Sequence, residues 1–165
     1  MDILPAREAD RPWVADLCRR YFGSAEIAAG GRLRPPALLP GLIAWEGGQR
    51  LGALAFEVEG GATEVVLLAA DPPGRGAGTA LLAALEALGA LRGWRRLWLL
   101  TTNDNTPALR FYQRRGWDVV ALHRGAVERD RTLKAEIPAV GHGGIPIRHA
   151  LELERRLEPR EEPLA

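Results

Sequence analysis

A short glycine-rich segment between a strand-like run and a helix-like run is the strongest constraint on the fold of this chain. Residues 63–70 have the pattern of a strand, three glycines follow within residues 74–78, and residues 79–91 place leucines at helical spacing. A continuous apolar run then occupies residues 97–100, as is typical of a strand that is covered on both faces. A strand, a helix and a second buried strand in this order predict a parallel crossover within a sheet.

The sequence on either side of this unit predicts further strands and helices. Residues 42–46 and 51–59 are strand-like runs joined by turn residues, so with residues 63–70 they predict an antiparallel meander. Together, the elements indicate a single α/β or α+β domain over residues 1–165, built on a mixed sheet. The other expected elements are, in chain order, a strand over 2–7, a helix over 10–22 capped by Asp10 or a neighbour, a loop with one helical turn over 23–40, a helix from Thr106 to Gly116, a strand over 117–122, a helix over 126–135, a glycine-rich turn at 141–144 and a strand over 145–153.

The charge balance and the cysteine content exclude some partners and compartments. The chain has 22 Lys and Arg residues against 21 Asp and Glu residues, so no global field favours nucleic acid or an anionic membrane as a partner. Its apolar stretches are shorter than the roughly 18 residues that a membrane span needs. The single cysteine, Cys18, cannot form a disulfide within the chain and is expected to pack as a small hydrophobic residue. Because the start has no signal-peptide pattern, we expect a cytoplasmic protein.

The glycines within residues 74–78 favour a site for a phosphate group. Glycine lets backbone N–H groups approach a ligand closely, and the start of the following helix adds unpaired donors and a partial positive charge. Taken alone, the segment is equally compatible with a simple tight turn. It is not a P-loop, because the only lysine in the chain is Lys134, and it is not a dinucleotide fingerprint, because Thr79 and Leu81 stand where the third glycine is required.

Two blocks of the sequence resemble the GNAT superfamily of N-acetyltransferases. The segment from Arg75 to Ala80 satisfies the acyl-CoA signature of that family, in which Gln or Arg is followed by two residues, Gly, one residue, and Gly or Ala. The second block contains Asn105, Ala108, the pair Phe111-Tyr112 and the pair Gly116-Trp117. Both blocks occur in the family's order and at a family-like separation. The resemblance implies a mixed, mainly antiparallel sheet of about six or seven strands flanked by helices, with a central strand-loop-helix acyl-CoA site.

The resemblance also assigns residues to acetyl-CoA as acyl donor, with no metal. The backbone of the glycine loop would hold the pyrophosphate, and the end of the preceding strand would pair with the pantetheine arm. Asn105 would contact the cofactor or cap its helix, and the two roles are compatible. Arg75 would add charge at the pyrophosphate, or would simply be solvated at the helix start. The implied cofactor-binding residues are Leu68, Ala69, Ala70, Arg75, Gly76, Ala77, Gly78, Thr79, Ala80, Asn105, Ala108 and Tyr112.

Two residues are candidates for the chemistry of acetyl transfer. Attack of an amine on a thioester needs a neutral amine, a polarised carbonyl and a protonated leaving sulfur. In the family position, Tyr112 would donate its phenolic proton to the sulfur of CoA; otherwise it is a core aromatic residue. Glu64 is a candidate general base acting through water, or else an exposed carboxylate at the end of a strand. The three histidines, His123, His142 and His149, have no metal-ligand spacing and receive no role.

Together, these features predict an acetyl-CoA-dependent N-acetyltransferase in which a primary amine attacks the donor directly in a ternary complex. The acceptor stays open, because a small-molecule amine, a protein N-terminus and a lysine side chain all fit the same donor loop. The alternative is a non-catalytic acyl-CoA-binding or sensor domain, which would keep residues 75–80 but would not need Tyr112. A purely structural protein is a third reading. The resemblance is also compatible with a homodimer.

Overall fold

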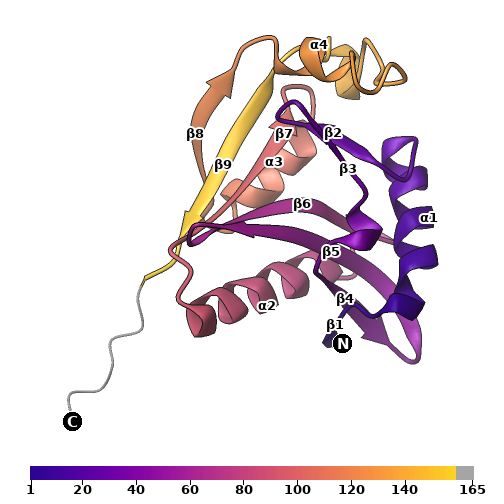
Figure 1. Ribbon diagram of the computed structural model, residues 1–165, viewed down its shortest axis with the longest axis vertical. Coiled ribbons are helices and arrows are strands. Elements are labelled where there is room, and N and C mark those ends of the chain that lie inside the picture. The colour runs from indigo at the N-terminus through magenta and orange to yellow at the C-terminus, as the bar shows by residue number, and fades with distance from the viewer. Residues whose placement is uncertain (159–165) are drawn as a thin grey trace.

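The computed structural model describes residues 1–158, which form layers of strands and helices (Figure 1). The strands are β1 (Asp2–Pro5), β2 (Ile27–Ala29), β3 (Arg32–Arg34), β4 (Gly41–Glu46), β5 (Gln49–Glu59), β6 (Ala62–Ala70), β7 (Arg96–Thr102), β8 (Asp118–His123) and β9 (Ala150–Arg156). The helices are α1 (Arg11–Phe22), α2 (Ala77–Arg92), α3 (Thr106–Gln113) and α4 (Ala126–Asp130), with short 3-10 turns η1 (Glu8–Asp10), η2 (Pro36–Leu38) and η3 (His142–Gly144).

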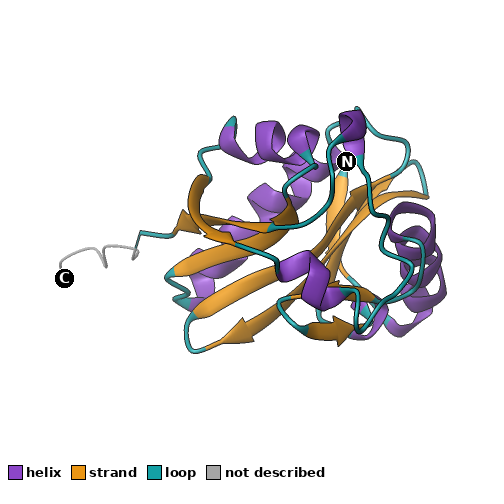
Figure 2. Ribbon diagram, turned by 90° about the horizontal axis from the view of Figure 1, so that it is seen from above, coloured by secondary structure: helices purple, strands orange, loops and turns teal. Residues whose placement is uncertain are grey.

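The sheet has the mixed, mainly antiparallel topology that the sequence predicts. In the described part of the chain, seven strands form one sheet in the order β1-β4-β5-β6-β7-β9-β8, and β2 and β3 form a separate hairpin. The meander of β4, β5 and β6 is antiparallel, whereas β6 and β7 run parallel with α2 between them, so the predicted crossover is confirmed. Seen from above, helices lie on both faces of the sheet (Figure 2).

Three hairpins turn on a Gly-Gly pair. Gly30-Gly31 joins β2 to β3, Gly47-Gly48 joins β4 to β5, and Gly60-Gly61 joins β5 to β6, all with φ between +57° and +80°. Glycine adopts this left-handed region at little steric cost, and such two-residue turns match the twist of the flanking strands. The first hairpin corrects the prediction of an irregular loop over residues 23–40.

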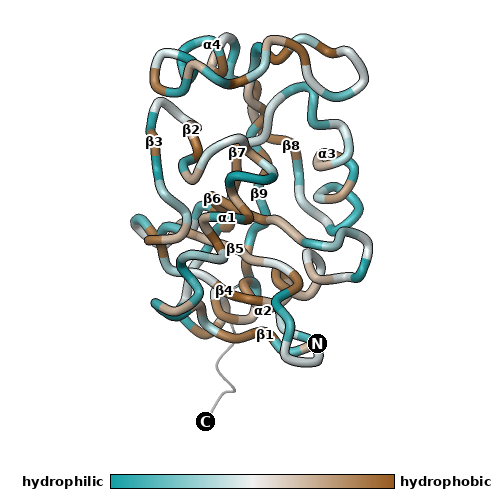
Figure 3. Tube along the Cα trace, turned by 90° about the vertical axis from the view of Figure 1, so that its right-hand side faces the viewer, coloured by the Kyte–Doolittle hydropathy of each residue, from teal (hydrophilic) through white to brown (hydrophobic). Residues whose placement is uncertain are grey.

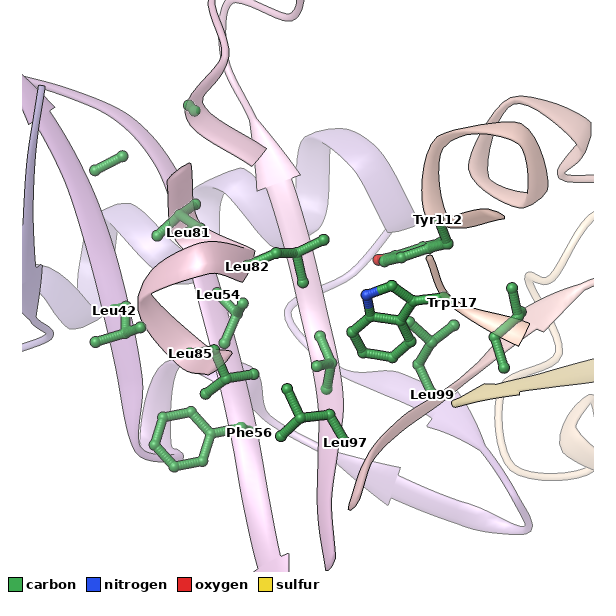
Figure 4. Packing of buried hydrophobic residues seen from close by; sticks show 14 of the residues in the cluster. Leu42, Leu54, Phe56, Leu81, Leu82, Leu85, Leu97, Leu99, Tyr112 and Trp117 are labelled. Atoms are coloured by element: carbon green, nitrogen blue, oxygen red, sulfur yellow. The ribbon is translucent and has the colours of Figure 1, made fainter. Parts of the chain in front are cut away.

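Apolar side chains pack on both faces of the sheet. Under α2 the larger cluster includes Leu54, Leu81 and Leu85, and it extends to Tyr112 and Trp117 (Figure 4). Under α1 a smaller cluster contains Val14, Leu17, Ile43, Ala53, Ala55, Leu67 and Ala69. Hydrophobic residues accordingly colour much of the central strands in Figure 3. Each fully buried leucine contributes about 1.5–3 kcal/mol through burial of apolar surface.

Two predictions from the composition can be compared with this packing. Cys18 is fully buried beside α1's apolar face, and burial raises the pKa of its thiol, as expected of a packed hydrophobic residue rather than a nucleophile. Within residues 1–158, no helix combines the length and the apolar character needed to cross a bilayer.

Several element boundaries differ from the prediction: β1 ends at Pro5 rather than at residue 7, and α3 ends at Gln113 rather than at Gly116. The carboxylate of Asp10 accepts a hydrogen bond from the backbone N–H of Arg7 at 2.8 Å, so it caps the turn η1 and not α1. Helix α4 ends at Asp130 rather than at residue 135. The last strand begins at Ala150 rather than at residue 145, because Oδ1 of Asn103 accepts hydrogen bonds from the two preceding backbone N–H groups, both at 2.9 Å.

The segment between β8 and β9 packs onto the segment between α1 and β4. Nζ of Lys134 donates to the carbonyl oxygens of Phe22 at 2.7 Å and Glu26 at 2.8 Å. The carboxylate of Asp130 accepts from the backbone N–H of Gly31 at 2.9 Å. Both charged side chains are buried, so they act as internal hydrogen-bonding groups for the backbone. These contacts hold the β2–β3 hairpin over the face of the sheet that α1 covers.

Candidate active site

The loop between β6 and α2 presents the start of a sixteen-residue helix to its surroundings. Gly76 is the N-cap of α2 and has φ +82°, a left-handed conformation that an L side chain rarely adopts. The first N–H groups of an α-helix have no partner within the helix, and they carry its partial positive charge. The structure therefore places anion-binding groups where the sequence predicts them.

Gly78 lies where α3 approaches the first turn of α2 closely. A Cβ atom at this position would lie 3.2 Å from Cζ of Phe111. The guanidinium of Arg115 stacks on the same ring at 3.6 Å from its centroid, and it donates to Oγ1 of Thr79 at 2.6 Å and 3.0 Å. Phe111 and Arg115 therefore join the first turn of α2 to α3.

A pocket of about 930 Å³ opens beside this junction. Three arginines line it, and Arg110 and Arg114 stand one helical turn apart. Within residues 1–158, neither of these two side chains forms an ion pair, and no carboxylate lines the pocket. An uncompensated group of guanidinium cations suits phosphate groups. The lining residues are Thr79, Thr106, Pro107, Arg110, Phe111, Arg114, Arg115 and His142.

The predicted cofactor residues only partly coincide with this lining. Thr79 belongs to both sets, whereas Arg110, Arg114 and Arg115 were missed. Their spacing on a predicted helix, with no acidic partner on the same face, is the signal that could have found them. Arg75 is half-exposed and contacts the carboxylate of Glu46, so its charge already has a partner.

Strands β6 and β7 separate close to the loop. Their parallel pairing covers only Ala62 to Glu64 against Arg96 to Trp98, although β6 continues to Ala70. The predicted pantetheine-binding residues Leu68, Ala69 and Ala70 thus lie where β6 has no pairing to β7. One group there is already engaged, because the hydroxyl of Tyr21 donates to the carbonyl oxygen of Ala70 at 2.8 Å.

Tyr112 lies on α3 at the inner end of the site. Its side chain is 7% exposed, and its ring packs 5.3 Å from that of Trp117. Figure 4 shows its hydroxyl pointing away from the backbone of α3, on the side where Leu82 lies. Burial raises the pKa of this phenol well above its ordinary value, so Tyr112 stays protonated through the neutral range.

Asn105 and Ala108 hold the helix that carries Tyr112. Oδ1 of Asn105 accepts from the backbone N–H of Ala108 at 3.2 Å, which makes Asn105 the N-cap of α3. The predicted capping role of Asn105 is therefore confirmed, and α3 begins at Thr106 as predicted.

Glu64 is buried and paired, not an exposed carboxylate at the end of a strand. Its two oxygens accept from the two terminal nitrogens of Arg34, each at 2.7 Å. Glu64 stands opposite Glu57 in the β5–β6 register, and Arg34 also donates to Glu57 at 2.9 Å. A single buried guanidinium thus keeps two facing carboxylates together.

Tyr112 and Glu64 approach the β6–β7 separation from opposite faces. Tyr112 belongs to the cluster under α2, whereas Glu64 is bound by Arg34 at the end of β3, on the face covered by α1. A donor entering beside α2 and an acceptor entering beside β3 would meet at the gap between the strands. This arrangement suits direct transfer between two bound substrates.

The segment before β9 completes the wall of the arginine pocket. Asp104 is buried, and its Oδ2 accepts from the backbone N–H of His142 at 3.0 Å. A Cβ atom at Gly141 would lie 2.0 Å from that oxygen, so a side chain there would have to displace the Asp104 carboxylate. Of the three histidines, His142 therefore lines the pocket, a position that the sequence did not reveal. Within residues 1–158, no cluster of three or more His, Cys, Asp or Glu side chains could hold a metal ion.

This combination of fold and site is that of an acetyltransferase. The model of the acetyltransferase (GNAT) family matches residues 7–117. The chain is 35% identical over 149 residues to the uncharacterised protein YdhI of Bacillus subtilis (strain 168), covering 90% of this chain and 93% of that protein. The chain therefore belongs to the GNAT family of acetyltransferases.

Two further similarities are more limited. A GNAT family acetyltransferase from Elizabethkingia anophelis, solved with acetyl-CoA bound, has the same fold with a TM-score of 0.73 at 17% identity, over 94% of this chain and 97% of that one. The mycothiol acetyltransferase of Clavibacter michiganensis subsp. michiganensis is 45% identical over 82 residues, which are 48% of this chain and 26% of that protein.

The Arg34 network yields a prediction about stability. Replacing Arg34 by Met leaves Glu57 and Glu64 facing each other without a cation, and breaking a buried pair in this way costs about 3–5 kcal/mol. Urea unfolding should show this loss in the free energy of unfolding. Arg32→Met is the matched control, because Arg32 is 56% exposed and, within residues 1–158, forms an ion pair only with Glu57, so its loss should cost about 0–1 kcal/mol. Equal losses for the two variants would contradict the assignment.

Proposed function

We propose that this chain is an acetyl-CoA-dependent N-acetyltransferase that transfers an acetyl group to a primary amine in a ternary complex. The observation that carries the proposal is the placement of a glycine loop, an arginine pocket and a buried tyrosine around the gap between β6 and β7. Acetyl-CoA matches these three features, because its phosphates suit the arginine pocket and the glycine loop, and its narrow thioester arm suits the gap beside Tyr112.

The donor would lie along three parts of the site. The backbone at Gly76, Ala77, Gly78, Thr79 and Ala80 would hold the pyrophosphate, and Arg75 would add charge only by releasing Glu46. The edge of β6 at Leu68, Ala69 and Ala70, which has no pairing to β7, would bind the pantetheine arm through main-chain hydrogen bonds, and the carbonyl of Ala70 would take part only if Tyr21 released it. Arg110 and Arg114 would hold the phosphate at the adenosine end, while Asn105 and Ala108 keep α3 in place beside the arm.

Tyr112 would supply the proton that the leaving group needs. The acceptor nitrogen forms a bond to the acetyl carbon as the carbon–sulfur bond breaks, and the phenol gives its proton to the departing sulfur. The proton released by the amine restores the phenol through solvent. A buried, protonated Tyr112 is suited to this role, and it argues against a non-catalytic sensor, which would need no acid.

Glu64 is the proposed general base, acting through a water molecule. It faces the side from which the acceptor would enter, and its two carboxylate oxygens accept hydrogen bonds from Arg34. The same ion pair would also position the strand, so a test must separate proton transfer from positioning. Small-molecule amines and protein amines both remain acceptors in this proposal, for a cytoplasmic protein consisting of one domain that forms a homodimer.

Calorimetry tests the donor site. We expect the purified protein to bind acetyl-CoA, and the double substitution Arg110→Ala/Arg114→Ala to weaken binding by about tenfold or more, since each lost charged hydrogen bond is worth about 1.5–3 kcal/mol. The same double substitution should weaken the binding of acetyl-CoA that lacks the 3′-phosphate by a smaller factor, because this ligand cannot make the phosphate contact in either protein. Arg92→Ala, on the exposed end of α2, is the control. Absence of binding by the unmodified chain would overturn the proposed function.

Steady-state kinetics with an amine that the enzyme acetylates test Tyr112 as the general acid. Tyr112→Phe should lower kcat by about 10²-fold or more while leaving the affinity for acetyl-CoA unchanged. Because burial raises the pKa of Tyr112, the rate of the unmodified enzyme should rise as the amine loses its proton and show no falling limb below pH of about 10. Unchanged turnover in Tyr112→Phe would remove this residue from the mechanism.

The pH profile tests the base. If Glu64 accepts a proton, Glu64→Gln should lower kcat by about 10²-fold where the amine is protonated, and the loss should shrink as pH rises. Glu57→Gln is the control, because it disturbs the same Arg34 network without removing the base. A loss that does not depend on pH, shared by both variants, would show that Glu64 only positions the strand.

A further inference from the structure

Trp117 carries a buried hydrogen-bond donor that has no partner. Its side chain is 2% exposed and lies in the apolar cluster under α2. Within residues 1–158, its indole nitrogen Nε1 is shielded from solvent and forms no hydrogen bond. Proteins pair almost all of their buried donors, and an indole N–H can donate but cannot accept. The exception at Trp117 therefore points to an acceptor that this N–H meets at another stage.

The unpaired N–H lies beside the proposed acid. The rings of Trp117 and Tyr112 have centroids 5.3 Å apart and planes inclined by 55°. Figure 4 shows the indole nitrogen on the edge of Trp117 that is turned toward Tyr112, on the side of the phenolic oxygen. In the same part of the chain, the Tyr112 oxygen accepts no side-chain hydrogen bond, and burial alone raises the pKa of this phenol. A donor and an oxygen that both lack a partner thus belong to neighbouring rings.

The chain between the two residues holds them in this relation. Helix α3 ends at Gln113, and Gly116, with φ +80°, turns the chain back toward the helix. The backbone N–H of Trp117 then donates to the carbonyl oxygen of Tyr112 at 3.2 Å. Leu99 and Leu153 belong to the same buried cluster. The indole therefore cannot turn its N–H toward solvent without opening the core.

We propose that Trp117 is a positioning residue for Tyr112, whose phenolic oxygen receives a hydrogen bond from the indole N–H as it gives its proton to the leaving sulfur. This inference rests on the proposed function, in which Tyr112 is the acid. The transferred proton moves from the phenol to the sulfur, and the indole keeps its own hydrogen. The phenolate then recovers a proton through solvent.

The charge that develops on Tyr112 explains why this bond would form during the reaction. Hydrogen bonds to an ionised acceptor are shorter and stronger than those to a neutral one, and catalytic hydrogen bonds often tighten only when the reactants are bound. Before the transfer, the indole offers no acceptor, so the hydrogen of the phenol has no partner on that side and is left for the sulfur. Donors that are fixed in an apolar surrounding stabilise a developing charge strongly.

Steady-state kinetics of Trp117→Phe test this role. The phenyl ring has no N–H, so kcat should fall by about tenfold or more, as for the loss of a hydrogen bond to a charged group, while the affinity for acetyl-CoA stays unchanged. Trp94→Phe is the matched control, because Trp94 packs against the same cluster, beside Phe56. The sulfur analogue of tryptophan, 3-benzothienylalanine, keeps the shape of the indole. At position 117 it should cause the same loss, even where Trp117→Phe loosens the core.

A double variant separates hydrogen bonding from packing. Trp117→Phe should have little further effect in a Tyr112→Phe background, because no phenolic oxygen is left to receive the bond. A packing role, or an indole N–H that rests on the ring face of residue 112, would lower kcat by the same factor in both backgrounds. That result, or full activity with the sulfur analogue, would overturn the inference.

Titration of a fluorinated phenol tests the contact without any acetyl transfer. A 3,5-difluorotyrosine at position 112 ionises at lower pH than tyrosine, and its phenolate can be followed by ultraviolet absorbance. Trp117→Phe should raise the pKa of this phenol, because the phenolate loses a donor, whereas Trp94→Phe should not change it. An unchanged or lowered pKa would overturn the contact. A chain that shows this rise but acetylates no amine would keep the contact and overturn the proposed function.

Discussion

The separation of β6 from β7 after Glu64 and Trp98 is the constraint on which the rest of the site depends. Beyond this point each strand keeps its partner on the other side, β5 for β6 and β9 for β7, so the sheet continues as two halves. Backbone groups on the facing edges are left without ladder partners, and buried backbone groups must find hydrogen bonds elsewhere. A ligand arm that offers amide groups can satisfy them. Helix α2 starts just after this edge, and α3 brings Tyr112 to the gap from the same face.

The sequence predicts the strand, loop and helix beside this gap well because these elements depend on local patterns. A strand, a glycine loop and a leucine-rich helix can each be recognised within a few residues, and a parallel crossover follows from their order. The Gly-Gly pair at Gly30 carried the same hairpin signal as those at Gly47 and Gly60, but its flanking strands have only three residues each and no clear alternation. The start of β9 could not be predicted in this way, because it is set by the distant side chain of Asn103.

The arginine pocket shows a different limit of reading one sequence. Arg110, Arg114 and Arg115 stand among many other arginines, most of which face solvent or carboxylates. Only the folded chain shows that Arg34, Arg75 and Arg96 have acidic partners while Arg110 and Arg114 have none within residues 1–158. Near-neutral net charge therefore conceals a local excess of positive charge. The excess lies at the end of α3 farther from its N-cap, beside the first turn of α2, where it adds to the partial charge of that helix start.

The face of the sheet that carries Glu64 is built from buried charges that link distant segments, and this explains why local motifs do not predict its arrangement. Arg34 joins β3 to two carboxylates of β5 and β6, while Lys134 and Asp130 tie the segment before β9 to the β2–β3 region. Each of these contacts spans more than twenty residues of sequence and depends on desolvated groups finding one another. Two sets of side-chain contacts therefore shape this face of the sheet, on which an amine would enter in the proposed function. One is made by Arg34, and the other by Lys134 and Asp130. The glycine loop between β6 and α2, in contrast, presents mainly its backbone, so its arrangement depends less on distant side chains.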